Sequence, residues 1–144
     1  MIAIASDHGG YALKLSIISF LDALHVPYKD FGCKNAESCD YVDFCVPAAR
    51  SVARGECEKG IVICGTGAGM SYTANKIKGI RCVLCSEPFT AKLSREHNNA
   101  NMLALGGRVV GDELAKMIVQ TWLNTEFSNE DRHRRRIEKI SALE

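Results

Sequence analysis

The stretch Ile61–Ser71, with the sequence IVICGTGAGMS, constrains the fold of this chain more than any other. It begins with a short β-branched apolar run, which is typical of a buried strand. Glycine then stands at three alternate positions, 65, 67 and 69, although glycine stabilises neither a strand nor a helix. The following segment 72–77 favours a helix that ends at Gly79. A strand that leads through a glycine loop into a helix N-terminus offers backbone N–H groups to an anion.

Cys64 is the last residue of this predicted strand and would face the anion-binding loop. A cysteine beside a helix N-terminus is deprotonated more readily than a free cysteine, and the thiolate is its reactive form. The sequence therefore puts a candidate base or nucleophile next to a cradle for developing negative charge.

The composition is that of one globular domain. A chain of 144 residues can bury a core of its own. Its net charge of +1 argues against a nucleic-acid binder that works by bulk electrostatics, and no apolar run reaches the length of a membrane span. The N-terminal segment 1–5 is too short for a signal peptide and has no charged region before it. We therefore expect a cytoplasmic protein that binds neither nucleic acid nor membrane.

The seven cysteines do not indicate a disulfide framework, because their number is odd and nothing points to secretion. Cys82 and Cys85 have the C-x-x-C spacing of zinc and redox sites, but they fall in the apolar run 80–85. Residues three apart on a strand point to opposite faces, so these two thiols cannot share a metal. We expect them to be small core residues, and we expect no metal site and no cofactor.

Strand and helix patterns alternate along the chain with short connections. Strands are expected at 2–5, 25–31, 61–64, 80–85 and 101–105, and helices at 13–24, 44–54, 72–77, 89–98, 114–122 and 130–142. The first helix has Leu13, Ile17, Ile18, Leu21 and Leu24 on one face at helical spacing, and the fifth is marked by Leu114, Met117, Ile118 and Trp122. The segment 33–43 is expected to be a loop. This alternation predicts a single α/β domain with a parallel sheet of about five strands and helices on both faces, followed by a C-terminal helical arm.

Ligands of parallel sheets bind at the carboxyl ends of the strands. The first strand leads to Asp7 and His8, and the third leads to Cys64 and its loop. The fifth leads to Gly106, Gly107 and Arg108. We also count His97 and Asn98, which lie just before the fifth strand, with this group. A thiol, a carboxylate, two imidazoles, an oxyanion cradle and a guanidinium suit proton transfer on a small anionic substrate.

Each feature also has a plainer interpretation. Asp7 could simply cap the first helix, the histidines could be satisfied surface or core residues, and the glycines could form a bare turn. The basic run 132–136 could be a solvated helix face, although Arg132 and Arg136 are four apart and could together hold a phosphate. The glycine spacing fits neither a Walker loop nor the dinucleotide fingerprint. Glu87 could still imitate the ribose-binding acid of that fingerprint, so a non-catalytic ligand-binding module stays open.

Signatures along almost the whole chain resemble those of the type B ribose-5-phosphate isomerases, whose relatives include the galactose-6-phosphate isomerase subunits. The matching segments are 6–10 (SDHGG), 40–41 (DY), 60–67 (GIVICGTG), 74–76 (ANK), 79–81 (GIR), 94–98 (SREHN), 107–111 (GRVVG) and 132–137 (RHRRRI). The resemblance implies a Rossmann-like three-layer sandwich and a homodimer, in some members paired into a tetramer. It also implies that the arm, residues 124–144, packs on the partner subunit.

The resemblance further implies the interconversion of D-ribose 5-phosphate and D-ribulose 5-phosphate, a reaction of the pentose phosphate pathway. Cys64 would be the base that moves a proton between C1 and C2, and Asp7 and His97 would open the furanose ring, with His97 as proton donor. Thr66 would carry protons between the two substrate oxygens. The other residues implied to bind substrate are His8, Tyr41, Gly65, Gly67, Ala68, Gly69, Asn98, Arg108, Arg132 and Arg136.

The chain departs from the family pattern at a few positions. One branch lacks the cysteine and uses a glutamate at the position of Met70, which cannot act as a base. Val42 stands where many members have proline, Asp43 where some have histidine, and Tyr72 where a small aliphatic residue is common. These positions lie in or near the region expected to line the substrate. Galactose 6-phosphate or allose 6-phosphate is therefore the alternative substrate.

Overall fold

The computed structural model describes residues 1–144, in which strands and helices alternate as predicted. The strands are β1 (Ile2–Ser6), β2 (Tyr28–Asp30), β3 (Lys59–Cys64), β4 (Cys82–Leu84) and β5 (Met102–Gly106). The helices are α1 (Tyr11–Ala23), α2 (Tyr41–Ala53), α3 (Ala68–Ala74), α4 (Pro88–Glu96), α5 (Asp112–Asn124) and α6 (Asp131–Ser141). None of these helices combines the length and the apolar composition that crossing a membrane requires. The predicted α/β fold with a C-terminal helix is confirmed.

All five strands are parallel and lie in the order β2-β1-β3-β5-β4. From β1 the chain moves outward to β2 and then returns to the other side of β1 to form β3. The strand order therefore reverses between β1 and β3, and a sheet of this kind binds its ligand in the crevice at that point. Ser6 pairs with Ile63 at this end of the two strands, so the residues that follow them emerge side by side.

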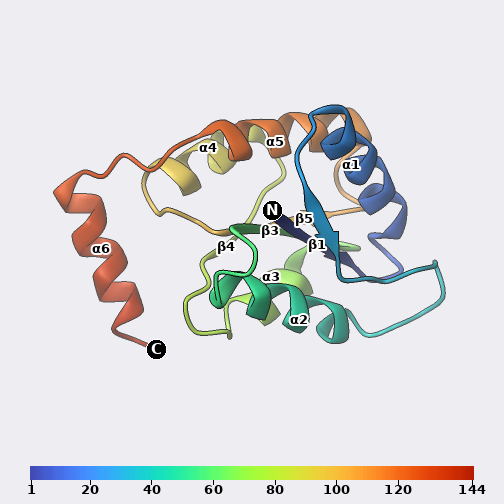
Figure 1. The fold of residues 1–144 in the computed structure, drawn as a ribbon, viewed down its shortest axis with the longest axis horizontal. Coiled ribbons are helices and arrows are strands. Elements are labelled where there is room, and N and C mark those ends of the chain that lie inside the picture. The colour runs from blue at the N-terminus through green and yellow to red at the C-terminus, as the bar shows by residue number, and fades with distance from the viewer.

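Alternation along the strands separates two hydrophobic cores, as a period of two residues requires. Ile4, Ile61 and Leu103 face one side, where they pack with α1, α4 and α5. Their neighbours on the same strands are mostly smaller and face the other side, where they pack with α2 and α3. Figure 1 shows these layers, with α1, α4 and α5 above the sheet, α2 and α3 below it, and α6 apart at one side. Cys64 belongs to the core between the sheet and helices α2 and α3.

Two helices begin three or four residues earlier than the sequence predicts. The third begins at Ala68 instead of residue 72, because Gly67 takes a left-handed conformation with φ of 80° and accepts the first helical hydrogen bond from the N–H of Ser71. The second begins at Tyr41 instead of residue 44. The glycine loop is therefore shorter than expected, and Gly69 lies in the first helical turn.

Three of the apolar residues that mark the first and fifth helices are exposed. Leu24, Leu114 and Met117 are 38%, 37% and 57% exposed. Helix α5 instead buries Ala115, Ile118, Val119 and Trp122. These four residues belong to the core on this side of the sheet, whereas Leu114 and Met117 lie on other sides of the helix, toward solvent.

Gly10 supports a testable prediction about this framework. A Cβ atom there would lie 2.4 Å from the carbonyl oxygen of Ile63, so Gly10→Ala must push α1 away from β3. We expect the free energy of unfolding to fall by roughly 1–3 kcal/mol, measured by urea denaturation. The matched control is Gly111→Ala, because a Cβ there meets nothing within 4 Å. Equal stability of the two variants would contradict the prediction.

Candidate active site

Three loops meet at the carboxyl edge of the sheet. The N–H of Gly107 donates to the carbonyl of Cys64 (2.8 Å), and the N–H of Arg108 donates to the carbonyl of Gly65 (2.9 Å). A Cβ on Gly9 would lie 3.0 Å from the nitrogen of Gly65, so any other residue at position 9 would strain this contact. A Cβ on Gly107 would lie 2.6 Å from the carbonyl oxygen of Gly9. The loops after β1, β3 and β5 therefore form one continuous backbone floor.

Cys64 lies at the centre of this floor with 4% of its surface exposed. Its Sγ accepts a hydrogen bond from the N–H of Gly67 at 3.1 Å, and Gly67 is the residue on which α3 starts. An N–H group and a helix N-terminus directed at sulfur stabilise negative charge there. The geometry can therefore hold a thiolate below the glycine loop, as the sequence suggests.

Thr66 and Tyr41 border the same loop. Thr66 is exposed, and its Oγ1 accepts the N–H of Ala68 at 3.3 Å. The ring of Tyr41 lies against Gly69, where a Cβ would come within 2.7 Å of the ring. Met70 is fully buried in the core under α2 and α3, so its side chain does not reach the site.

Asp7 and Arg108 bring opposite charges to the floor. Asp7 is 6% exposed, and its Oδ1 accepts the N–H of Gly10 at 3.1 Å. The capping interpretation of Asp7 is therefore partly right, since Gly10 is the residue before α1. The guanidinium of Arg108 lies over Gly65, with Nη1 3.2 Å from where a Cβ would stand, and so puts a positive charge above the loop.

His8 makes a contact that the sequence does not indicate. Its Nδ1 lies 3.2 Å from the backbone N–H of Cys39, in the loop that the sequence predicted between β2 and α2. A backbone N–H can only donate, so Nδ1 must carry the lone pair and the proton of the neutral ring must sit on Nε2. Cys39 thus fixes the orientation of His8, through a contact between residues far apart in the sequence.

A buried lysine holds the start of this loop. Lys14 on α1 is 1% exposed, and its Nζ donates to both carboxylate oxygens of Asp30 (2.8 and 2.9 Å) and to the carbonyl of Cys33 (2.6 Å). A buried ammonium is stable only when it is paired and hydrogen-bonded in this way. Lys14 therefore ties the exit of β2 to α1, and the sequence analysis did not single it out.

His97 and Asn98 do not join this group. They follow α4, which runs back across the sheet, so they lie at the amino edge, where Arg81 donates from Nε to the carbonyl of Asn98 (2.9 Å). Cys64 pairs with Gly106 at the other end of β5, and the length of β5 separates the two edges by about 13 Å. The expectation that His97 and Asn98 meet Cys64 within one chain is wrong, since a residue just before a parallel strand lies at its amino end.

The arm brings its arginines to the amino edge. The N–H of Ser128, ahead of α6, donates to the carbonyl of Glu96 at 2.9 Å, and the ring of His133 stacks on that of His97. Arg132 and Arg136 are exposed on the same helix. The candidate residues therefore form two groups: Asp7, His8, Tyr41, Cys64, Thr66, the 65–69 backbone and Arg108 at the carboxyl edge, and His97, Asn98, Arg132 and Arg136 at the amino edge.

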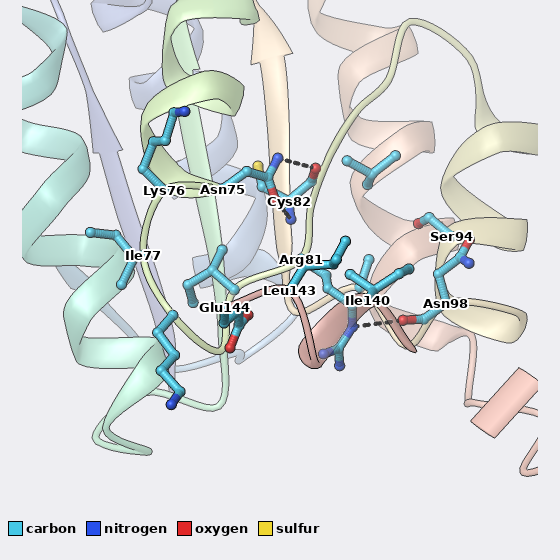
Figure 2. A pocket seen from close by; sticks show the side chains of 14 residues that line it. Asn75, Lys76, Ile77, Arg81, Cys82, Ser94, Asn98, Ile140, Leu143 and Glu144 are labelled. Carbon is cyan, nitrogen blue, oxygen red and sulfur yellow. Dashed lines mark hydrogen bonds between the residues drawn. The ribbon is translucent and has the colours of Figure 1, made fainter. Parts of the chain in front are cut away.

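An open groove of about 640 Å³ lies between the end of α6 and the β4 edge of the sheet. Figure 2 shows Ile140 and Leu143 on the arm side, with Arg81 and Asn98 joined by the dashed hydrogen bond nearby. Glu144 ends the arm by accepting the N–H of Gly79 at 2.9 Å. The groove thus adjoins the amino-edge group.

Two alternatives from the sequence are resolved. Both carboxylate oxygens of Glu87 accept the N–H of Thr90 at 3.0 Å, so this residue caps α4. Hydrogen bonding to the side chain of Thr90, and then to its backbone, lowers the pKa of Glu87. Cys85 lies in the core toward α4 and α5, whereas Cys82 packs against the core toward α2 and α3. The prediction that the C-x-x-C thiols point to opposite faces is confirmed.

Comparison with known proteins identifies the family. A family model described as Ribose/Galactose Isomerase matches residues 2–140. The chain belongs to the Ribose/Galactose Isomerase family. It is 49% identical to ribose-5-phosphate isomerase B of Escherichia coli strain K12, over 99% of this chain and 95% of that protein. It is 39% identical to a D-erythrulose-4-phosphate isomerase of Pectobacterium atrosepticum, over 88% and 84% of the two chains.

A solved structure agrees with the family assignment. Ribose-5-phosphate isomerase B from Clostridium thermocellum superposes with a TM-score of 0.96 at 52% identity, covering 99% of this chain and 95% of that one. The predicted Rossmann-like three-layer sandwich is therefore confirmed, and membership in this isomerase family makes the chain an enzyme.

Thiol chemistry gives a prediction for the site. Burial raises the pKa of Cys45 and of Cys85 to about 12, so roughly one in 10⁴ of these thiols is ionised at pH 8. We expect iodoacetamide at pH 8 to modify Cys64 well before Cys45 or Cys85 in the native protein, as followed by peptide mass spectrometry. In urea all three should react. Native Cys45 or Cys85 labelled as fast as Cys64 would contradict this expectation.

Proposed function

We propose that this protein is an aldose–ketose isomerase that interconverts D-ribose 5-phosphate and D-ribulose 5-phosphate through an enediolate. The observation that carries the proposal is the Cys64 thiol, buried below a glycine loop and bonded to the N–H of Gly67. A base beside a cradle of N–H groups is what proton transfer next to a carbonyl requires. The name of the E. coli relative supports the five-carbon substrate.

The residues at the carboxyl edge account for the isomerisation step. The Cys64 thiolate takes the proton from C2 of the open-chain aldose, and the C–H electrons form the C1–C2 double bond while the carbonyl electrons pass to O1. The 65–69 backbone and the Arg108 guanidinium stabilise the resulting negative charge. The Thr66 hydroxyl moves a proton between O2 and O1, and the Cys64 thiol returns its proton to C1. The ketose results, and Cys64 is a thiolate again.

Ring opening precedes this step for the aldose, which is mainly a furanose. Asp7 accepts the proton of the C1 hydroxyl while His97 donates one to the ring oxygen, so that the C1–O4 bond breaks and the aldehyde forms. His8, Arg108, Arg132 and Arg136 hold the phosphate and the sugar, with Tyr41 and Asn98 beside them. Guanidinium groups suit phosphate because their N–H groups bind its oxygens in pairs.

The complete site requires two copies of the chain. Within one copy, His97 and Asn98 are separated from Cys64 by the length of β5, about 13 Å. We therefore infer a homodimer, alone or paired into a tetramer, in which the arm (124–144) packs on the partner subunit. The carboxyl edge of one copy then meets the amino edge of the other. Seven free cysteines also fit a reducing compartment such as the cytoplasm.

Proton NMR in D₂O tests the reaction. We expect D-ribose 5-phosphate to yield D-ribulose 5-phosphate with deuterium incorporated at the carbon that exchanges, because the base trades its proton with solvent. Erythrulose 4-phosphate and the 6-phosphates of galactose and allose are run beside it. Exchange with only one of these would keep the mechanism and change the substrate. No exchange with any sugar, in folded protein, would favour the non-catalytic binding module.

Cys64→Ala is the decisive variant for this assay. Loss of the general base should lower the exchange rate by about 10²–10⁴-fold, while inorganic phosphate should still bind, as followed by titration calorimetry. Cys57→Ala is the matched control, because this thiol is also buried on the same side of the sheet but lies ahead of β3, away from the loop. A fully active Cys64→Ala enzyme would refute the role of this base.

Mixing inactive subunits tests the shared site. Cys64→Ala and Arg136→Ala chains, unfolded together and refolded, should regain about a quarter of the parent activity, because half of the random dimers contain one intact site of two. The control mixes Cys64→Ala with Thr66→Ala. These residues lie in the same group, so no intact site can form. Absence of rescue in verified heterodimers would exclude sites shared between subunits.

A further inference from the structure

His133 is the only buried residue of α6. It sits in an otherwise exposed run of arginines, yet its own side chain is 3% exposed. The long arginine side chains account for the exposed surface of α6, but they do not explain why the imidazole of His133 is buried. His133 has no role in the proposed reaction.

Two contacts fix the His133 ring. It stacks on His97 with 4.3 Å between the ring centroids and 27° between the planes. Its Nδ1 lies 2.6 Å from the hydroxyl of Ser128. One face of the ring thus rests on the proposed proton donor, while one ring nitrogen is held by the linker before α6.

Ser128 is hydrogen-bonded both to the end of α4 and to the start of α6. Its N–H donates to the carbonyl of Glu96 (2.9 Å), the residue before His97. Its Oγ accepts the N–H of Glu130 (3.2 Å), the residue on which α6 starts. Nearby, the buried Arg95 donates from Nε to the carbonyl of Thr125 (3.2 Å). The His133 ring is therefore fixed relative to the end of α4, and so relative to His97.

The surroundings of the His133 ring disfavour its protonation. Burial lowers the pKa of His133, and the neighbouring His97, Arg132 and Arg136 lower it further. His133 is therefore neutral near pH 7 and can stack on a charged ring without opposing its charge.

We propose that His133, held by Ser128, is a positioning residue that keeps the His97 imidazole in the orientation from which it protonates the ring oxygen of the sugar. The inference rests on the proposed function and deepens it. It assigns His133 no contact with substrate. A purely structural role in docking α6 is the competing explanation, and the two differ in which step they affect.

The substrate pair separates these explanations. D-ribulose 5-phosphate stays open-chain, because its phosphate occupies the C5 hydroxyl that would close a ring on C2. Deuterium exchange into its C1 position needs only the enediolate step, whereas conversion of D-ribose 5-phosphate also needs ring opening. The ratio of the two rates reports on ring opening alone, and His97→Asn supplies the reference for its loss.

Four variants carry the test. His133→Leu removes the flat ring, His133→Phe keeps it, and Ser128→Ala removes only the anchoring hydroxyl. Arg135→Gln is the matched control, an exposed residue of the same helix with no assigned role. Circular dichroism and size-exclusion chromatography verify the fold and the assembly of each variant.

We expect His133→Leu to slow ribose 5-phosphate conversion about tenfold, part of the 10²–10⁴ that a general acid supplies, with exchange into ribulose 5-phosphate little changed. Ser128→Ala should shift the ratio in the same direction, and it keeps the test available if His133→Leu does not fold. Arg135→Gln should stay within about threefold of the parent, since the whole site is retained. His133→Phe keeps the stacking but loses the Ser128 hydrogen bond, so it should be impaired less than His133→Leu and about as much as Ser128→Ala.

Equal loss of both rates in His133→Leu and Ser128→Ala would show a structural role and overturn the proposal. So would an unchanged ratio, or a His133→Phe enzyme as impaired as His133→Leu. If the unsubstituted protein converts no sugar phosphate, the proposed function fails and this inference falls with it. An active parent with an unchanged ratio in the variants would refute only the role of His133.

Discussion

The close backbone contact among the loops after β1, β3 and β5 is the constraint on which the site depends. Gly10 lies against the carbonyl of Ile63, and Gly107 lies against the carbonyl of Gly9, at distances where any Cβ would clash. These contacts hold the 65–69 backbone over Cys64, whose Sγ accepts the N–H of Gly67. The glycines thus serve two purposes, because they permit the packing of the loops and expose the donors that can stabilise an anion.

The parallel sheet then decides which residues can share that floor. Every connection that crosses from a strand to a helix leaves the carboxyl edge, and every return reaches the amino edge. His97 follows α4 and therefore lies on the return side, as do Arg132 and Arg136 through the arm. Within one chain, Cys64 and His97 therefore lie at opposite ends of β5. Pairing of two copies is the simplest arrangement in which all the proposed groups meet.

The sequence predicted the sheet and most of the floor, because strand alternation and glycine spacing are local signals. It marked the fifth helix by Leu114, Met117, Ile118 and Trp122 but could not tell which of them face the core, since this helix has apolar residues on several sides. The position of His97 was predictable in principle from the rule that a residue before a parallel strand lies at its amino edge. The contacts of Cys39 with His8 and of Lys14 with Cys33 join residues 19 to 31 positions apart, and no local pattern encodes them.

The separation of the two groups also bears on proton chemistry. The proposed base must be a thiolate and the proposed acid an imidazolium, and two such groups in permanent contact would form an ion pair or exchange the proton. On opposite edges of each chain, their protonation states are set by separate surroundings. The N–H of Gly67 stabilises negative charge on Cys64, whereas the ring of His97 is stacked on that of His133. In a dimer the two groups would meet across the bound sugar, which separates them while the proton moves.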